Sequence, residues 1–113
     1  MSSYKLLTIR KLIASKPVGI CNFAVGNNNI FIHNIQVNKS FRNQHIGTFL
    51  LNQVEDYSIK NDIDTISLVV KQKPLDSLTE FYFKNGYKKI SEEVNYYDDG
   101  ETTYDLIRME KQI

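Results

Sequence analysis

The mostly apolar residues 18–25 are predicted to form a β-strand, whose side chains point alternately to two faces, Ile20, Asn22 and Ala24 to one and Cys21, Phe23 and Val25 to the other. Cys21 and Phe23 share one side of this stretch. A second strand is predicted over residues 30–37. Glycine and asparagine fill positions 26–29 between them, and both residue types tolerate positive φ, so the pattern predicts a hairpin.

Residues 4–14 mix apolar side chains with lysine and arginine, and two interpretations stay open. We expect a strand, but Leu6, Ile9 and Ile13 also fit one face of a short helix. A turn is predicted at 15–17, where serine and lysine precede a proline. The first third of the chain is therefore predicted to be an antiparallel meander.

Two stretches have helical periodicity. The first, residues 45–60, is predicted to be an amphipathic helix, and the β-branched residues 64–70 that follow are predicted to form a strand buried on both faces. After a loop at 71–74, a second helix is predicted over 75–85, and Gly86 is placed to end it. The first helix has its apolar face at Ile46, Phe49, Leu50, Gln53, Val54 and Tyr57.

The last part of the chain is predicted as a strand at 87–90, a polar acidic loop at 91–101 and a final strand at 102–109. The resulting order is β-β-β-α-β-α-β-β, which predicts an α/β fold. Because the chain shows no repeat, linker or low-complexity tract, we expect residues 1–113 to form a single domain.

Composition excludes several classes of function. With 42% hydrophobic and 24% charged residues the chain is ordinary for a globular protein, and its net charge of +1 gives no footprint for nucleic-acid binding. The apolar runs are too short for a membrane span, and no signal peptide precedes them. One cysteine, Cys21, and two histidines, His33 and His45, argue against a disulfide or a metal cluster. We therefore expect a cytoplasmic protein without a metal and without nucleic-acid or membrane partners.

The segment from Ile32 to Leu51 has the features of an anion site. A strand, a polar loop and the start of a helix follow one another, and such a loop delivers backbone N–H groups to a helix N-terminus. Arg42 adds charge, Gly47 permits a close backbone approach, and no acidic residue lies in the segment. The pattern is consistent with a pyrophosphate cradle, and an ordinary loop with a solvated arginine is the alternative.

The sequence RNQHIG at 42–47 resembles the acetyl-CoA motif of the GNAT N-acetyltransferases, (Arg/Gln)-x-x-Gly-x-(Gly/Ala), with His45 at the first glycine. Residues 80–87, EFYFKNGY, are similar to the Phe-Tyr-x-x-x-Gly-Phe/Tyr element of that family, and MEK at 109–111 is similar to its Met-x-Lys ending. The resemblance implies a mixed, mainly antiparallel sheet with two main helices. It also implies a short form that lacks the family's N-terminal strand and two helices, so its acceptor site is either open or completed by a partner subunit.

The resemblance further implies acetyl-CoA as the acetyl donor. In the family the backbone amides of the loop hold the pyrophosphate. The strand before the loop splays from its neighbour, here residues 68–70, and the pantetheine arm forms backbone hydrogen bonds in the gap as an extra strand would. Normally paired core strands are the alternative. The implied cofactor-binding residues are Ile35, Gln36, Val37, Arg42, Asn43, Gln44, His45, Ile46, Gly47 and Thr48.

Two residues are implied as catalytic. Tyr82 occupies the position of the family's helix tyrosine, whose hydroxyl protonates the departing thiolate, and a plain core tyrosine is the alternative. His33 lies where many members place a glutamate base, and histidine suits that role because it titrates near neutrality. The alternative is that His33 is a hydrogen-bonded strand residue and that water accepts the proton of the amine. The family's cofactor-binding asparagine and its alanine are replaced by Leu75 and Leu78.

The acceptor is implied less directly. Tyr96 and Tyr97, followed by DDGE, resemble a loop of members that acetylate protein N-termini, and a solvated hairpin tip is the alternative. We expect acetyl transfer to a primary amine, with a protein lysine or N-terminus slightly favoured. A small-molecule amine and a non-catalytic CoA-binding or protein-interaction domain remain the alternatives. An exposed final strand leaves a homodimer open.

Overall fold

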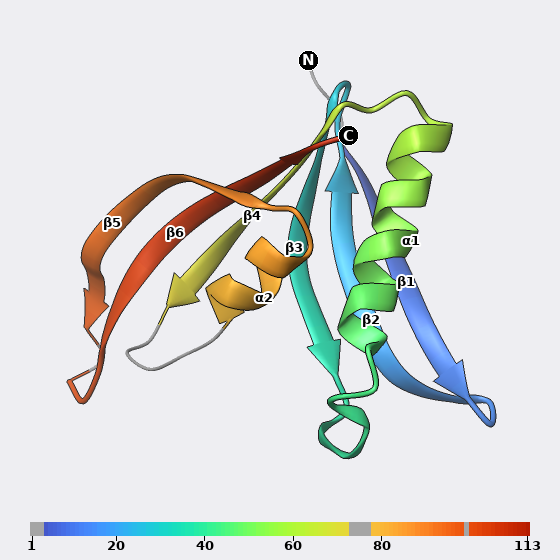
Figure 1. Ribbon diagram of the computed structural model, residues 1–113, viewed down its shortest axis with the longest axis horizontal. Helices are drawn as coiled ribbons and strands as arrows, with labels where there is room; N and C mark the ends of the chain where they lie inside the picture. Colours follow the sequence, from blue (N-terminus) through green and yellow to red (C-terminus); the bar gives the residue numbers. More distant parts are fainter. Residues whose placement is uncertain (1–3, 73–77, 99) are drawn as a thin grey trace. The chain divides into compact units, whose positions relative to one another are not determined.

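The computed structural model describes residues 4–72, 78–98 and 100–113. Its contacts divide the chain into two compact units, Met1–Ile66 with Gln112–Ile113, and Ser67–Lys111. The α/β class and the predicted order of strands and α-helices are confirmed (Figure 1). The described elements are β1 (Lys5–Ile13), β2 (Lys16–Val25), β3 (Asn29–Val37), the 3-10 helix η1 (Lys39–Phe41), α1 (Ile46–Lys60), β4 (Thr65–Gln72), α2 (Leu78–Lys84), β5 (Lys88–Asp98) and β6 (Thr103–Gln112).

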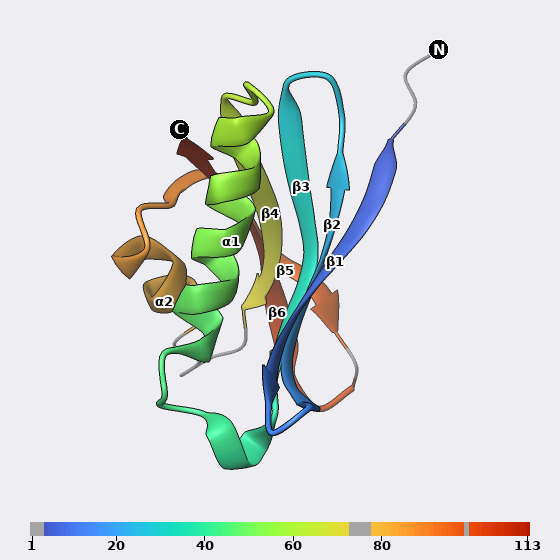
Figure 2. The ribbon, with the colours of Figure 1, turned by 90° about the vertical axis from the view of Figure 1, so that its right-hand side faces the viewer.

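In the first unit β1, β2 and β3 pair as an antiparallel meander, and α1 lies along one face of it (Figures 1 and 2). The strand interpretation of residues 4–14 is thus confirmed over the helical one. Cys21 and Phe23 point toward α1, where the Phe23 ring meets that of Tyr57 edge-on at 5.7 Å between centroids. Ile20 and Asn22, which alternate with them, therefore lie on the opposite face, called the open face below.

The core of the first unit fills the space between α1 and the meander. Gly19 allows this close packing, because a Cβ there would lie 2.6 Å from Ile46 Cγ2 and 3.3 Å from Leu50 Cδ1. Burial of these apolar side chains is what fixes the start of α1 against β2. The buried members are Val18, Cys21, Phe23, Ile30, Ile32, Ile46, Leu50, Leu51 and Val54.

Both hairpin turns differ in detail from the expectation. The first turn lies at Ala14 and Ser15, which have φ of 51° and 64°, and Pro17 already pairs with Leu12 in the sheet. The predicted turn at 15–17 was therefore placed too late. The second turn closes through Gly26 N–H donating to Asn29 O at 2.8 Å, but none of residues 26–29 has positive φ, so its position was right and its stated reason wrong.

β3 carries a bulge at His33. Asn34 pairs with Asn22 while Ile32 pairs with the next residue of β2, Phe23, so His33 has no opposite residue in β2. Such an extra residue bends a strand and increases its local twist. The bulge keeps Ile32 and Ile35 on the α1 face although they are three positions apart, since their partners in β2 both face α1.

In the second unit β5 pairs with β6 over most of its length, from Lys88 to Asp98. The predicted polar loop at 91–101 was therefore wrong, because residues 91–98 continue the strand. Pairing with a neighbouring strand can hold a polar sequence in a strand, since backbone hydrogen bonds need no apolar side chain.

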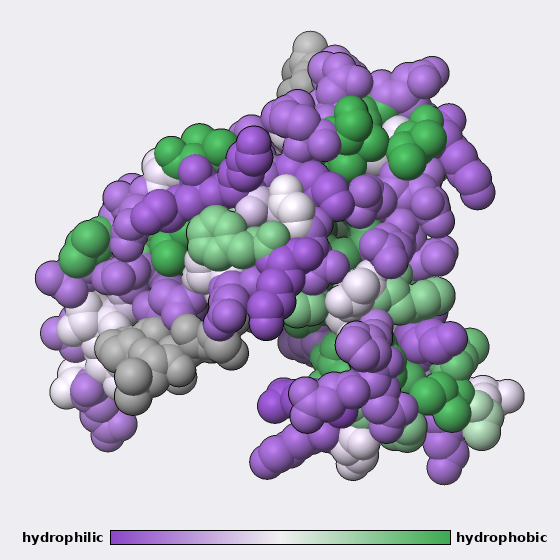
Figure 3. Space-filling view, viewed as in Figure 1, coloured by the Kyte–Doolittle hydropathy of each residue, from purple (hydrophilic) through white to green (hydrophobic). Residues whose placement is uncertain are grey.

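Figure 3 shows that the visible surface is largely hydrophilic with scattered hydrophobic groups.

α2 ends at Lys84, one residue before the predicted end, and Gly86 follows it as predicted with a φ of +92°, a left-handed conformation that favours glycine. Gly86 N–H donates to Phe83 O at 3.0 Å, and Tyr87 N–H donates to Tyr82 O at 3.0 Å. Positions 73–77, which include Leu75 and part of the predicted loop and helix, lie outside the described residues, whereas Lys71 and Gln72 belong to β4 rather than to a loop. The buried side chains of this unit are Leu68, Val70, Tyr82, Tyr87, Ile107 and Met109.

The strand predicted at 64–70 is β4, which begins at Thr65. Ile66, Leu68 and Val70 are buried, but the residues between them are only half-buried. The expectation of burial on both faces was therefore too strong. In the part of the chain described here, neither α-helix is long and apolar enough to cross a membrane.

Candidate active site

The loop between β3 and α1 contains two residues with left-handed backbone conformations. Asn43 and His45 both have left-handed backbone conformations, with φ of 67° and 60°, and His45 is the N-cap of α1. Asn38 caps the short η1 helix instead, because its side-chain oxygen accepts from Ser40 N–H at 3.0 Å. No side chain caps α1, and no acidic residue lies in its first turn.

The first turn of α1 consequently offers backbone donors. Phe49 N–H donates to His45 O at 2.9 Å, the first hydrogen bond of the helix. The N–H groups of Ile46, Gly47 and Thr48 come before it and have no carbonyl partner within the helix. The residues from Arg42 to His45 are exposed, so an anion can approach this end of the helix. The local dipole and the N–H groups both favour negative charge there. Of the predicted cofactor residues 42–48, Ile46 is buried in the core, Gly47 and Thr48 are half-buried, and the others are exposed at the start of α1.

The end of β3 presents its residues to two different faces. Ile35 pairs with Cys21 and faces α1, whereas Gln36 pairs with Ile20 and is exposed on the open face. Asn38 N–H donates to Val18 O at 2.7 Å and ends the pairing with β2. Ile35, Gln36 and Val37 therefore stand directly before the loop, as the sequence predicts.

His33, the predicted base, is exposed at the bulge of β3. Its ring meets that of Phe31 edge-on, with 5.2 Å between centroids. The described residues show no carboxylate or other hydrogen-bond partner that would orient the imidazole. Its role as a base therefore stays a prediction.

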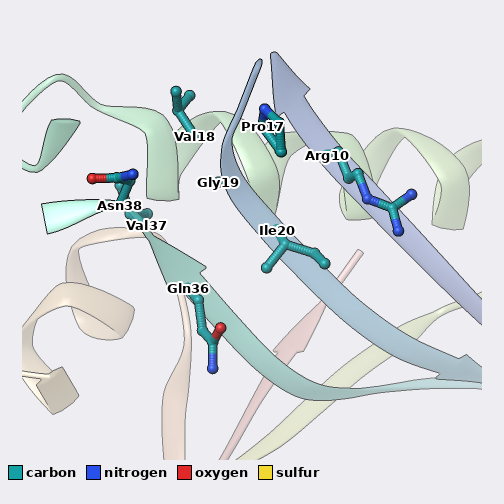
Figure 4. A pocket seen from close by; sticks show the side chains of 8 residues that line it. All are labelled: Arg10, Pro17, Val18, Gly19, Ile20, Gln36, Val37 and Asn38. Atoms are coloured by element: carbon teal, nitrogen blue, oxygen red, sulfur yellow. The ribbon is translucent and has the colours of Figure 1, made fainter. Parts of the chain in front are cut away.

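A pocket of about 350 Å³ opens on the first unit at the end of the meander (Figure 4). Arg10 of β1 and Gln36 of β3 flank Ile20 of β2, because both residues pair with it in the sheet. Sequence reasoning missed Arg10, since no local motif marks it and only strand register brings it beside Gln36. The remaining lining residues are Pro17, Val18, Gly19, Val37 and Asn38.

Tyr82 lies in the second unit, on α2, with only 7% of its surface exposed. Its ring makes edge contacts with Phe81 and Tyr87 at centroid distances of 5.2 and 5.8 Å. The packing holds the ring in place and also fits a purely structural tyrosine. Its predicted role as an acid is therefore not decided by its surroundings.

Tyr96 and Tyr97 belong to the end of β5, not to a loop. Asn95, just before them, has φ of 56° and its N–H donates to Asp105 Oδ1 at 2.9 Å, where the β5–β6 register shifts. Tyr96 is 52% exposed, as a peptide contact would require. Tyr97 pairs with Tyr104 through the backbone, and its side chain lies outside the described part of the structure.

The single cysteine is placed in the core. Cys21 is fully buried, and burial raises the pKa of its thiol to about 12. Among the side chains the structure describes, no group of three or more His, Cys, Asp or Glu is arranged to hold a metal ion.

Comparison with solved structures finds the same fold repeatedly. The ribosomal-protein-S18-alanine N-acetyltransferase from Escherichia coli superposes with a TM-score of 0.87 at 22% identity, over 96% of this chain and 69% of that one. A GNAT family acetyltransferase from Elizabethkingia anophelis with acetyl-CoA bound gives 0.80 at 17% identity, over 94% and 75%. An aminoglycoside 6'-N-acetyltransferase complexed with coenzyme A gives 0.78 at 21% identity, over 95% and 72%.

No curated protein matches the chain. The family model described as an acetyltransferase (GNAT) domain, however, matches residues 3–112. The uncapped start of α1 lies where the sequence carries the acetyl-CoA motif of that family. The chain therefore belongs to the GNAT acetyltransferase family.

Proposed function

We propose that this protein transfers the acetyl group of acetyl-CoA to a primary amine by direct attack, without a covalent enzyme intermediate. The observation that carries the proposal is the N-terminus of α1, which has no side-chain cap and no acidic residue in its first turn. Exposed Arg42 stands at the start of the same surface. This donor set suits a pyrophosphate, because backbone N–H groups and one guanidinium supply charge-assisted hydrogen bonds.

Residues 42–48 would hold the pyrophosphate, and the end of β3 would align the pantetheine arm through backbone groups. When bound, acetyl-CoA supplies a thioester whose carbonyl carbon accepts the amine. The backbone N–H near Ile35 polarises the thioester carbonyl, as a fixed dipole does without reorganising. Holding donor and acceptor in place supplies much of the rate through proximity.

Two proton movements complete the proposed mechanism. The Tyr82 hydroxyl donates its proton to the sulfur that leaves, and a phenol suits a leaving group that is itself moderately acidic. The amine nitrogen loses its proton either to the exposed His33 imidazole or to ordered water. Both assignments rest on the family resemblance and on these residues' positions along the chain.

The acceptor is proposed to be a protein lysine or N-terminus. The exposed Tyr96 side chain supports a peptide contact, and the similar E. coli protein is named a ribosomal-protein-S18-alanine N-acetyltransferase. A small-molecule amine is the second candidate, and the pocket of about 350 Å³ favours it because its size matches a small acceptor.

Titration calorimetry with acetyl-CoA tests the cofactor surface. We expect Arg42→Ala to weaken binding roughly tenfold or more through the loss of a charge-assisted contact. We expect Gly47→Trp to abolish binding, because the indole would occupy the approach of the phosphates. The matched control is Lys60→Ala, which removes the same charge from the opposite end of α1. Absence of wild-type binding at millimolar acetyl-CoA would contradict the proposal.

Tyr82→Phe tests the assigned acid. We expect the turnover number for acetyl transfer to fall about a hundredfold or more, with acetyl-CoA affinity unchanged, since the ring remains and only the proton donor is lost. Tyr57→Phe, which keeps its edge contact with Phe23, serves as the control. An unchanged rate would remove Tyr82 from the mechanism. Cofactor binding without transfer to any protein or small amine would favour the non-catalytic alternative.

A further inference from the structure

The open face of the first unit carries two neighbouring rows of side chains that cross its strands. Thr8 Oγ1 donates to Asn22 Oδ1 at 2.7 Å, and Asn22 Nδ2 donates to Asn34 Oδ1 at 2.8 Å, so one row of side chains crosses all three strands. The next row toward the end of the meander is Arg10, Ile20 and Gln36. The first row satisfies its own hydrogen bonds, whereas the second lines the pocket.

Arg10 is the charged group of this pocket. It is exposed, and the described residues give its guanidinium no hydrogen bond and no salt bridge. Its neighbour Lys11 points to the other face, where Nζ lies 4.6 Å from the centroid of the Phe49 ring. The positive charge on the open face at this point therefore belongs to Arg10 and is available to a ligand.

The pocket floor and rim restrict which ligands fit. Ile20 and Pro17 supply apolar contacts, while Gln36 stands across Ile20 from Arg10 (Figure 4). An arginine and a neutral amide on either side of an apolar residue suit a carboxylate, which accepts two parallel N–H bonds from a guanidinium. Among the described residues that line the pocket none is acidic, so none of them repels such a group.

The pocket also adjoins the end of β3. Gln36 and Val37 line it, and they belong to the stretch proposed to align the thioester. We propose that this pocket binds a carboxylate carried by the acceptor, with Arg10 as the anchor, so that the enzyme prefers amines with a negative group a few bonds from the nitrogen. The inference rests on the proposed function and names its substrate class.

Paired acceptors that differ only in this group test it. β-Alanine and β-alaninamide represent small acceptors, and N-terminal peptides with Asp or Asn at the second position represent protein acceptors. We expect the carboxylate member of at least one pair to be acetylated with the higher kcat/KM. Which pair responds identifies the source of the carboxylate, a free amino acid or an acidic peptide.

Arg10→Gln should lower kcat/KM for the carboxylate acceptor roughly tenfold or more, through KM, and leave the amide acceptor unchanged. Arg10→Lys should restore part of the loss, and Lys11→Gln, which removes the same charge on the other face, should have no effect. Equal losses for both members of a pair, or no loss for either, would overturn the proposal.

A binding measurement separates this inference from the proposed function. N-acetyl-β-alanine is titrated into the wild-type chain without cofactor while the Arg10 Nε–H resonance is followed, with the corresponding amide as control. A saturable shift with the carboxylate but not with the amide supports carboxylate binding in the pocket, even where no acceptor is acetylated. In that case the proposed function fails and the inference about the pocket stands. Absence of a shift overturns the inference even where acetyl transfer is observed.

Discussion

At the scale of single residues, Cys21 shows how position decides chemistry. Its side chain lies on the α1 face of β2 with no exposed surface. Burial disfavours the thiolate and raises the pKa from 9.0 to about 12. Because the thiolate is the nucleophile, the thiol at this position is unreactive, and the cysteine behaves as a small core residue.

We therefore expect an aromatic disulfide reagent to modify Cys21 in the denatured chain but not in the native chain near pH 8. The same shift has a consequence for stability. A raised folded-state pKa contributes stability that is fully present below pH 9 and is lost as the pH rises from about 9 to about 12. The absorbance of the released aromatic thiol measures the reaction, with urea-denatured protein as the control. Rapid labelling without unfolding would contradict the prediction.

At the scale of elements, the contact between β2 and α1 depends on a missing side chain. Gly19 brings the strand close to the first turn of the helix, and Ile46 fills the space in front of it. The same residue, Ile46, begins the helix whose N–H groups form the proposed cofactor surface. Packing in the core and geometry at the cofactor surface are thus set by one contact.

Gly19→Ala tests this contact. We expect the free energy of unfolding to fall by about 1–3 kcal/mol, because the new Cβ meets a branched side chain at its root rather than at a flexible end. In an Ile46→Ala background the added cost should shrink by about 0.5 kcal/mol or more, since the clashing methyl group is gone. Chemical denaturation of the four proteins of this cycle gives both values. Strictly additive costs would show that the contact is not the cause.

Elements with an apolar face were predictable, and those without one were not. β2 and α1 follow their hydrophobic periods closely, because burial against each other holds them in place. β5 was mistaken for a loop beyond residue 90, since pairing with β6 rather than burial keeps it extended. The bulge at His33 leaves no local signature, as it is defined by the register against β2.

At the scale of the whole molecule, the described chain consists of two compact units, and the first unit is built from two segments that are far apart in the sequence. The last two residues return to the first unit, where Ile113 N–H donates to Asp64 O at 2.8 Å and Thr65 Oγ1 bonds Gln112 Oε1 at 3.1 Å. β4 begins in one unit and continues in the other. Such divisions arise from long-range contacts, which no local pattern encodes.

The two candidate sites differ in the same respect. The proposed cofactor surface lies within one continuous segment, residues 42–48, so its residue types alone suggest an anion site. The open-face pocket draws Arg10, Ile20 and Gln36 from three strands. Only the pairing register places them side by side, and the sequence alone offered no reason to connect them.

The bulge at His33 has a consequence for how this chain can vary in evolution. Between Ile30 and Val37, the paired part of β3, His33 is the one residue without an opposite in β2, so the pairs on both sides of it survive its deletion with their faces unchanged. Losing a residue of the strand that does not adjoin the bulge would exchange the buried and exposed sides of everything beyond it. Insertions and deletions among relatives should therefore collect at this position, and alignments of the strand should place their gap here.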